Sequence, residues 1–202
     1  MAAVADTTTI IFAGGLGTRL GGIKKALLDV GGKPIVERIL DVVGPISREL
    51  IVVDNDDSLA ALPGVRIVPD SETRAGVLTA LHSGLTAAGA ELCLVVACDM
   101  PFLNGSALGW LIDEAAEFDV VIPVTEGQLE PMHAVYRRAP CVRAIGQALA
   151  RGEKRMISYF KDVRVREVPE DDIRRFDPEL RSFFNVNTPE DLELARDLAS
   201  SS

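Results

Sequence analysis

The chain has 202 residues, of which 48% are apolar and 25% are charged. This composition is ordinary for a globular protein, so we expect one domain over residues 1–202, with loosely held ends at about 1–6 and 199–202. The formal net charge of -9 argues against a general nucleic-acid binder, because phosphate backbones require a positive field. A locally basic pocket for one phosphorylated ligand remains compatible with that charge.

Signals for secretion, membrane insertion and structural metals are missing from the sequence. The opening "MAAVADTTT" has neither a basic region nor an apolar leader, and no run approaches the ~20 apolar residues of a membrane span. Cys93, Cys98 and Cys141 are too widely spread for a disulfide framework or a zinc site. We therefore expect a cytoplasmic protein with no membrane or nucleic-acid partner.

Short strand-like runs alternate with amphipathic stretches along the chain. Strands are expected at residues 8–13, 49–55, 65–70, 91–99, 119–124, 133–138 and 163–168. Helices are expected at residues 33–46, 75–89, 105–118, 140–152 and 188–199. This alternation predicts an α/β fold with three layers, in which a mostly parallel, Rossmann-like sheet carries helices on both faces. Ligands bind such sheets at the carboxyl ends of their strands.

Several segments allow finer predictions. The continuous apolar run at 91–99 predicts a central strand, and the alternating run at 163–168 predicts a half-exposed or edge strand. The acidic segment 169–179 is interpreted as a surface loop. Helix boundaries are expected at three residues that are typical of helix ends, namely Gly89, Ser106 and Thr188.

A glycine-rich loop, "IIFAGGLGTRLGGIKKALL", follows the first expected strand. It does not fit the Walker A pattern, and the dinucleotide fingerprint fails because Leu20 stands where its last glycine belongs. Gly14, Gly15 and Gly17 nevertheless let backbone N–H groups approach an anion closely. The loop predicts a phosphate site, and a tight strand-to-helix turn is the alternative.

Three basic side chains accompany these glycines. Arg19 offers a planar fork for phosphate oxygens, whereas Lys24 and Lys25 offer point charges. This set suits a triphosphate better than a single phosphate. If the loop is only a turn, the same side chains are simply exposed to solvent.

Carboxylates follow several of the expected strands. Asp99 ends the most apolar strand and is a natural magnesium ligand for a nucleoside triphosphate, or alternatively caps the next turn. Asp70 is equally well explained as a ligand or as an Asx-turn residue. The acidic run at 54–57 is interpreted as a solvated loop, although Asn55 lies at the carboxyl end of its strand, where such sheets bind ligands.

Two amides and two further side chains complete the candidates. In an extended segment, Asn185 and Asn187 point to the same face, where they could contact a heterocycle, a sugar or a metal-bound phosphate. Alternatively, Asn187 only organises the turn before the last helix. Cys98 is interpreted as a core residue, and His133 as a packed strand residue rather than a general base.

Taken together, the motifs resemble those of the molybdenum cofactor guanylyltransferase family, within the glycosyltransferase-A-like nucleotidyltransferases. "FAGGLGTRLGGIKKALL" and "LLDVGGKPI" resemble the superfamily opening, whereas "VVACDMPFL", "PMHAVYRR" and "FFNVNTPEDL" resemble segments specific to the family. The resemblance covers nearly the whole chain. It implies transfer of GMP from GTP to the terminal phosphate of molybdopterin or the molybdenum cofactor, with release of pyrophosphate.

The resemblance also implies roles for individual residues. Lys25 contacts phosphate, and Asp99 holds Mg²⁺. The residues that wrap the GTP phosphates are Ala13, Gly14, Gly15 and Arg19. The nucleoside and acceptor sides of the cleft are formed by Asn55 and Asp70, and by Asn185 and Asn187, respectively. Lys25, Arg19 and Asp99 are the expected catalytic set.

The sequence departs from the family after Asp70, where "ETRAGVL" keeps Gly76 but lacks the usual G-P pair. That loop bears on base and acceptor choice, so three alternatives stay open. These are a CTP-dependent molybdopterin cytidylyltransferase, a sugar- or polyol-phosphate nucleotidyltransferase, and a non-catalytic nucleotide-binding module. Contacts with other cofactor-biosynthesis or acceptor proteins are a further expectation from the family, whereas the sequence leaves the oligomeric state open.

Overall fold

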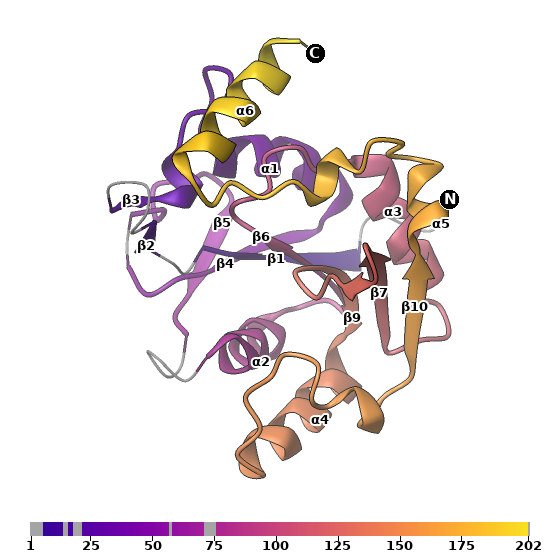
Figure 1. Cartoon of the computed structure of the whole chain (residues 1–202). Helices are drawn as coiled ribbons and strands as arrows, with labels where there is room; N and C mark the ends of the chain where they lie inside the picture. Colours follow the sequence, from indigo (N-terminus) through magenta and orange to yellow (C-terminus); the bar gives the residue numbers. More distant parts are fainter. Residues whose placement is uncertain (1–5, 14–15, 18–21, 57, 71–75, 202) are drawn as a thin grey trace.

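The computed structural model describes residues 6–13, 16–17, 22–56, 58–70 and 76–201. One central sheet lies between two layers of helices, with α1, α3 and α6 on one side and α2 and α4 on the other (Figure 1). The main path of the sheet has the strand order β10-β7-β9-β6-β1-β4-β5, and β8 pairs with β7. The predicted three-layer α/β fold is confirmed.

The strands fall into the main sheet and a small hairpin. The main sheet contains β1 (Thr7–Phe12), β4 (Glu49–Val53), β5 (Val65–Val68), β6 (Leu92–Ala97), β7 (Val120–Thr125), β8 (Gln128–Leu129), β9 (His133–Arg137) and β10 (Val165–Pro169). The hairpin consists of β2 (Leu16–Gly17) and β3 (Ile23–Lys24). Strands β6, β1, β4 and β5 are mutually parallel, whereas β9 runs antiparallel to both of its neighbours. The predicted edge strand near 163–168 is β10, at one end of the sheet.

Six α-helices and four short 3₁₀ helices connect the described strands. The α-helices are α1 (Ile35–Val43), α2 (Val77–Ala87), α3 (Gly105–Glu114), α4 (Arg138–Ala150), α5 (Glu170–Arg174) and α6 (Pro189–Ser200). The 3₁₀ helices are η3 (Lys25–Leu27), η4 (Gly44–Ile46), η5 (Phe160–Asp162) and η6 (Arg181–Phe183). None of the helices in the described part of the chain is long and apolar enough to cross a membrane.

The core is divided by the sheet into two halves, because successive strand residues point to opposite faces. Ile11 on β1 belongs to the half that α1 and α3 cover, whereas Ile10 belongs to the half that α2 and α4 cover. On the second face α2 packs very close to β1. A Cβ added at Gly84 would lie 2.8 Å from Ile10 Cγ2, so a glycine is required at this helix position.

The helix ends confirm one predicted boundary and correct two. Thr188 caps α6 in a capping box with Asp191, as the sequence predicts for a threonine before proline. The cap of α3 is Asn104, whose side chain accepts the N–H groups of Ser106 and Ala107, so Ser106 is not the cap. The C-cap of α2 is Ala88 rather than Gly89, whose N–H instead donates to Glu49.

Two segments add detail to the predicted elements. The acidic stretch 169–179, interpreted as a loop, contains the short helix α5, whose Ile173 is buried in the core. At the C-terminus, α6 extends through residues 199 and 200, and the loosely held ends stay a prediction. Ala199 packs against the core there, and this contact explains why the helix continues.

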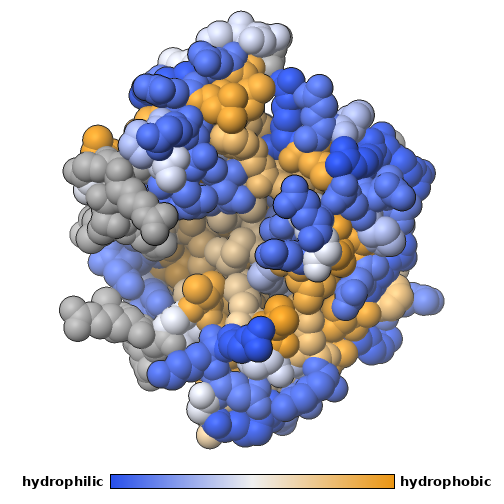
Figure 2. All heavy atoms as spheres, viewed as in Figure 1, coloured by the Kyte–Doolittle hydropathy of each residue, from blue (hydrophilic) through white to orange (hydrophobic). Residues whose placement is uncertain are grey.

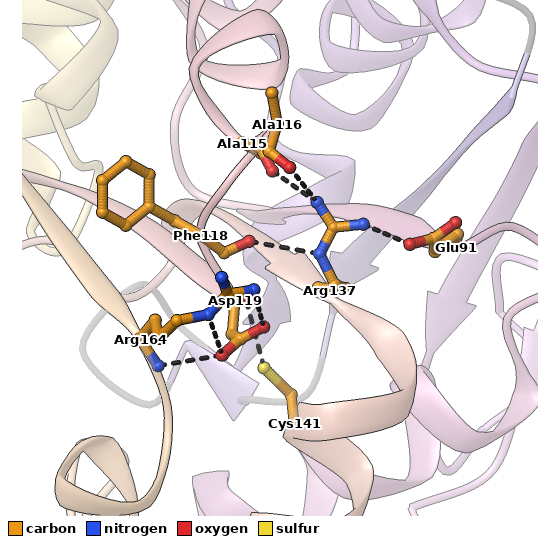
Figure 3. Close-up of polar contacts among 8 residues, drawn as sticks. All are labelled: Glu91, Ala115, Ala116, Phe118, Asp119, Arg137, Cys141 and Arg164. Carbon is orange, nitrogen blue, oxygen red and sulfur yellow. Dashed lines mark hydrogen bonds and ion pairs between the residues drawn. The ribbon is translucent and has the colours of Figure 1, made fainter.

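Arg137 joins the end of β9 to the turn that follows α3 (Figure 3). Its guanidinium donates to the carbonyls of Ala115, Ala116 and Phe118 and pairs with Glu91. Only 18% of this side chain is exposed. These carbonyls lie at the end of a helix, where backbone acceptors need outside partners. Arg137 therefore connects two elements far from the carboxyl ends of the central strands.

We expect Arg137→Met to lower the free energy of unfolding by about 3 kcal/mol, because the substitution leaves several acceptors without their charged donor. Urea unfolding monitored by circular dichroism measures this change. The matched control is Arg143→Met on the exposed side of α4, which we expect to change stability by less than about 0.5 kcal/mol. Equal effects of both substitutions would contradict a structural role for the Arg137 contacts.

Candidate active site

The candidate site lies at the carboxyl ends of β1, β4 and β6, which are adjacent and parallel. Backbone bonds continue past the strand ends, because the Ala13 N–H donates to Val53 and the Cys98 N–H to Phe12. These bonds fix the positions at which Asp54 and Asp99 leave the sheet. The described parts of the glycine-rich loop leave from the same edge.

Lys25 connects three chain segments at this edge. Its Nζ donates to Asp99 Oδ2 at 2.9 Å and to Asn187 Oδ1 at 2.6 Å. The side chains of Lys25 and Asp99 are 20% and 18% exposed, so the pair is partly accessible to a ligand. An ammonium group has three N–H donors, and the described residues bind only two of them. Lys25 can therefore donate one hydrogen bond to an anion in the cleft.

The second carboxylate oxygen of Asp99 is a candidate metal ligand. Oδ1 is buried and accepts no hydrogen bond from the described residues. A buried carboxylate oxygen without a donor is costly unless a cation or water completes its shell. The described residues contain no cluster of three acidic, histidine or cysteine side chains that could hold a metal ion. Asp99 therefore fits a magnesium ion that takes most of its other ligands from phosphates and water.

The two asparagines are held in place by the start of α6. The Val186 N–H donates to the Asp99 carbonyl, which links this extended segment to the end of β6. The N–H of Asn187 donates to Asp191, which also belongs to the capping box. Asn187 thus contacts Lys25 and also begins the turn before α6, whereas its contact with a ligand stays a prediction. Asn185 lies beside it at the same cleft.

A cleft of about 370 Å³ brings the predicted residues together. Four of them line it, namely Lys25, Asp99, Asn185 and Asn187. Figure 2 shows this view of the molecule hollowed near its centre, with pale apolar atoms at the bottom and hydrophilic residues around the rim. Phe12, Cys98 and Met132 contribute apolar lining. Such a pocket combines an apolar wall with a few convergent polar groups.

A larger cavity of about 590 Å³ adjoins this cleft, and Glu130 and Asn185 line both. Thr125 Oγ1 donates to Glu130 Oε1 at 2.5 Å, which holds the carboxylate at the boundary. Phe183 lines the second cavity and packs on His133 with 4.3 Å between ring centroids. The sequence analysis missed Glu130, because its place in a hairpin connection carries no motif.

Asn55 and Asp70 meet at the end of β4 and β5. The Asn55 side-chain oxygen accepts the N–H of Asp70 at 2.9 Å. Neither residue lines the cleft that contains Lys25. The structure therefore brings these two predicted nucleoside contacts together, on the β4–β5 side of the sheet edge.

The acidic run at 54–57 is not simply a solvated loop. Asp54 is 5% exposed and forms an ion pair with Lys24, which also pairs with Asp56. Burial by itself lowers the pKa of Lys24, but hydrogen bonds to both aspartates outweigh it and raise the pKa. The sequence interpretation fails for Asp54 because its partner lies 30 residues earlier in the chain.

Several predictions lie outside the described residues. Gly14, Gly15 and Arg19 belong to the undescribed part of the glycine-rich loop, so their phosphate contacts stay predictions. The departure from the family after Asp70 falls largely at residues 71–75, which also lie outside. Ala13 is described and buried, at the end of β1.

His133 and Cys98 are buried, as predicted. Burial lowers the pKa of His133 to about 4, although the Asp177 carboxylate partly opposes this shift, so the ring is neutral near pH 7. Burial raises the pKa of the Cys98 thiol to about 12, so this thiol is not a thiolate nucleophile at that pH. The described cleft therefore offers neither a histidine base nor a thiolate.

The sequence of this chain matches a known protein family and several curated relatives. The family model described as the MobA-like NTP transferase domain matches residues 9–166. A probable molybdenum cofactor guanylyltransferase of Pelotomaculum thermopropionicum is 36% identical over 197 residues, covering 98% of this chain and 95% of that protein. A probable molybdenum cofactor guanylyltransferase of Methanosarcina mazei is 38% identical over 200 residues, covering 92% and 88%.

A solved structure agrees with these sequence relatives. The crystal structure of molybdopterin-guanine dinucleotide biosynthesis protein A from Archaeoglobus fulgidus superimposes with a TM-score of 0.82 at 28% identity, covering 96% of this chain and 100% of that one. The lysine, carboxylate and paired amides thus stand at the sheet edge of a fold shared over nearly the full length. The chain belongs to the MobA-like NTP transferase family.

Proposed function

We propose that the protein transfers GMP from GTP to the terminal phosphate of molybdopterin and releases pyrophosphate. The observation that carries this proposal is the cluster of Lys25, Asp99 and Asn187 at the sheet edge. The names of the relatives support guanine as the base and molybdopterin as the acceptor. GTP and molybdopterin are therefore the proposed substrates.

The proposed chemistry is a single displacement at phosphorus. A terminal phosphate oxygen of the acceptor attacks the α-phosphorus of GTP, forms a new P–O bond and displaces pyrophosphate from the opposite side. A phosphate oxygen is already anionic near neutral pH, so the nucleophile needs no general base. This agrees with a cleft whose described part provides neither a histidine base nor a thiolate.

The main barrier is electrostatic, because two anions must approach each other. Lys25 is positioned to donate to a phosphate oxygen and to stabilise the charge that builds up in the transition state. Asp99 is the proposed holder of Mg²⁺ through its unpaired Oδ1. When bound, this ion supplies positive charge that offsets the repulsion between phosphates. Arg19 and the amides of Gly14 and Gly15 remain the predicted partners of the remaining phosphate oxygens.

The acceptor is proposed to enter from the side of Asn185, where the larger cavity adjoins the cleft. This leaves the glycine-rich loop and the pair of Asn55 and Asp70 for the nucleotide. The two substrates then meet near Lys25 from different directions, as an in-line displacement requires.

The three described cysteines are free and buried, which is consistent with the predicted cytoplasmic location.

The nucleotide preference tests the proposed function directly. Pyrophosphate release should be measured with GTP, CTP, ATP and UTP, each with and without molybdopterin. We expect release that requires molybdopterin and is fastest with GTP. Faster release with CTP would indicate the cytidylyltransferase alternative, and release with a sugar phosphate in place of molybdopterin would indicate a different acceptor. If no pair releases pyrophosphate, the non-catalytic binding module becomes the better description.

Lys25→Ala should reduce kcat at least about 100-fold, which corresponds to about 3 kcal/mol of lost transition-state stabilisation. We expect the variant to fold with a lowered free energy of unfolding, because the largely buried Asp99 carboxylate loses its charged partner. Turnover and thermal unfolding of the purified variant measure both quantities. A folded variant with near wild-type turnover would remove Lys25 from the mechanism.

Asp99→Asn should raise the magnesium concentration that gives half-maximal activity about tenfold, since an amide oxygen is a weaker ligand than a carboxylate. A magnesium titration of pyrophosphate release at saturating GTP provides the measurement. Asp113→Asn on α3, away from the sheet edge, serves as the control and should leave the titration unchanged. An unchanged titration for Asp99→Asn would show that Asp99 does not hold the ion.

A further inference from the structure

Two consecutive lysines at the sheet edge reach in different directions. Lys25 contacts Asp99, at the end of β6, whereas Lys24 contacts Asp54, at the end of β4. The proposed chemistry uses Lys25 and leaves Lys24 without a role. The Lys24 side chain is 9% exposed, less than half the exposure of Lys25. Burying a charged lysine is costly unless its ammonium group is paired and hydrogen-bonded.

Each donor of Lys24 has a protein partner. Nζ pairs with Asp54 and with Asp56, the latter at 2.8 Å, and donates to Ser58 Oγ at 2.9 Å. An ammonium group has three donors, so none remains for a phosphate oxygen in this arrangement. The hydrogen bond from Lys24 lowers the pKa of Asp56 to about 2, so the pair stays charged throughout the neutral range. Lys24 thus differs from Lys25, for which the described residues leave one donor to a ligand.

These contacts link two walls of the proposed nucleotide site. Lys24 belongs to β3, which pairs with β2 in the hairpin of the glycine-rich loop. The residues it contacts, Asp54, Asp56 and Ser58, belong to the loop after β4. That loop contains Asn55, whose N–H donates to Asp54 Oδ1 and whose side chain accepts from Asp70. A continuous chain of contacts therefore runs from Lys24 through Asp54 and Asn55 to Asp70.

We propose that Lys24 is a positioning residue that fixes the loop after β4, so that Asn55 and Asp70 are presented to the nucleoside part of the substrate. This inference rests on the proposed function, because it takes Asn55 and Asp70 as the nucleoside side of the site. Lys24 acts through the loop and contacts no phosphate. Removing it should therefore weaken binding of the nucleoside while leaving binding of the triphosphate group intact.

The test compares two ligands that share the phosphate chain. The affinity of Mg²⁺–GTP and of Mg²⁺–tripolyphosphate should be measured by isothermal titration calorimetry for the wild type and for Lys24→Met. We expect Lys24→Met to bind GTP about tenfold more weakly and tripolyphosphate within twofold of the wild type. In turnover assays with molybdopterin, the KM for GTP should rise by a similar factor while kcat stays within about twofold.

Lys33→Met is the control, because Lys33 is also an aspartate-paired lysine but meets a single partner, Asp41, at an exposed surface. It should leave both affinities unchanged. Asp56→Asn provides a second variant in case the buried Asp54 charge prevents Lys24→Met from folding. Asp56 is 54% exposed, so its loss should be tolerated, and we expect a two- to fourfold loss of GTP affinity alone.

Three results would overturn the inference. Equal losses for GTP and tripolyphosphate would show that Lys24 binds phosphate directly. Unchanged GTP affinity in Lys24→Met, or in Asp56→Asn if the first variant does not fold, would show that the loop is positioned without Lys24. A wild-type protein that binds no nucleotide would overturn the proposed function as well, so the two failures are distinguishable.

Discussion

The ion pair between Lys25 and Asp99 is the contact on which the arrangement of the site depends. It joins η3, which follows the glycine-rich loop, to the end of the central strand β6, and Asn187 adds the start of α6. In the chain, Asp99 lies 74 residues after Lys25 and Asn187 lies 162 residues after it. The pair is largely buried, so the cost of desolvating both charges offsets much of their attraction and its net contribution to folding stability is small. Its importance lies in holding a cation and a carboxylate at the place where phosphates would react.

The same pair also explains how the site avoids a buried charge imbalance before substrate binds. Lys25 and Asp99 neutralise each other, and the described residues leave one polar atom of each available, an N–H on the lysine and Oδ1 on the aspartate. The N–H offers a position for an anion and Oδ1 a position for a cation, so both could bind beside a pair that is itself neutral. Little reorganisation would be needed when substrate arrives, which is the condition for strong electrostatic catalysis.

The sequence was informative where local patterns determine structure. Apolar periodicity predicted the central strands and the helices on both faces, and the capping box of Thr188 followed from the sequence. The cluster of Lys25, Asp99 and Asn187 could be anticipated because all three residues follow strands or precede a helix, at the edge where parallel sheets bind ligands. The short helix α5 was missed, since five residues with only one buried apolar side chain give little periodicity.

Long-range charge pairing was the part that the sequence could not predict. The run at 54–57 has the composition of a solvated loop, and only the position of Lys24 after folding turns Asp54 into a buried partner. Glu130 likewise becomes a boundary residue only because β7 and β9 bring its hairpin next to the segment with Asn185. Neither the pairing of Asp54 with Lys24 nor the position of Glu130 produces a local sequence pattern, because each depends on elements that the sheet brings together.

The two lysines illustrate why adjacent, chemically identical residues need not share a function. Both reach the carboxyl edge of the sheet, but strand β1 separates the aspartates that they contact. Lys24 is enclosed by three oxygen acceptors and would have to break those contacts to reach a phosphate. In the described part of the chain Lys25 contacts two acceptors, which leaves its third donor for a phosphate. The number of acceptors around each ammonium group, rather than its charge, therefore separates a positioning lysine from one that can bind substrate.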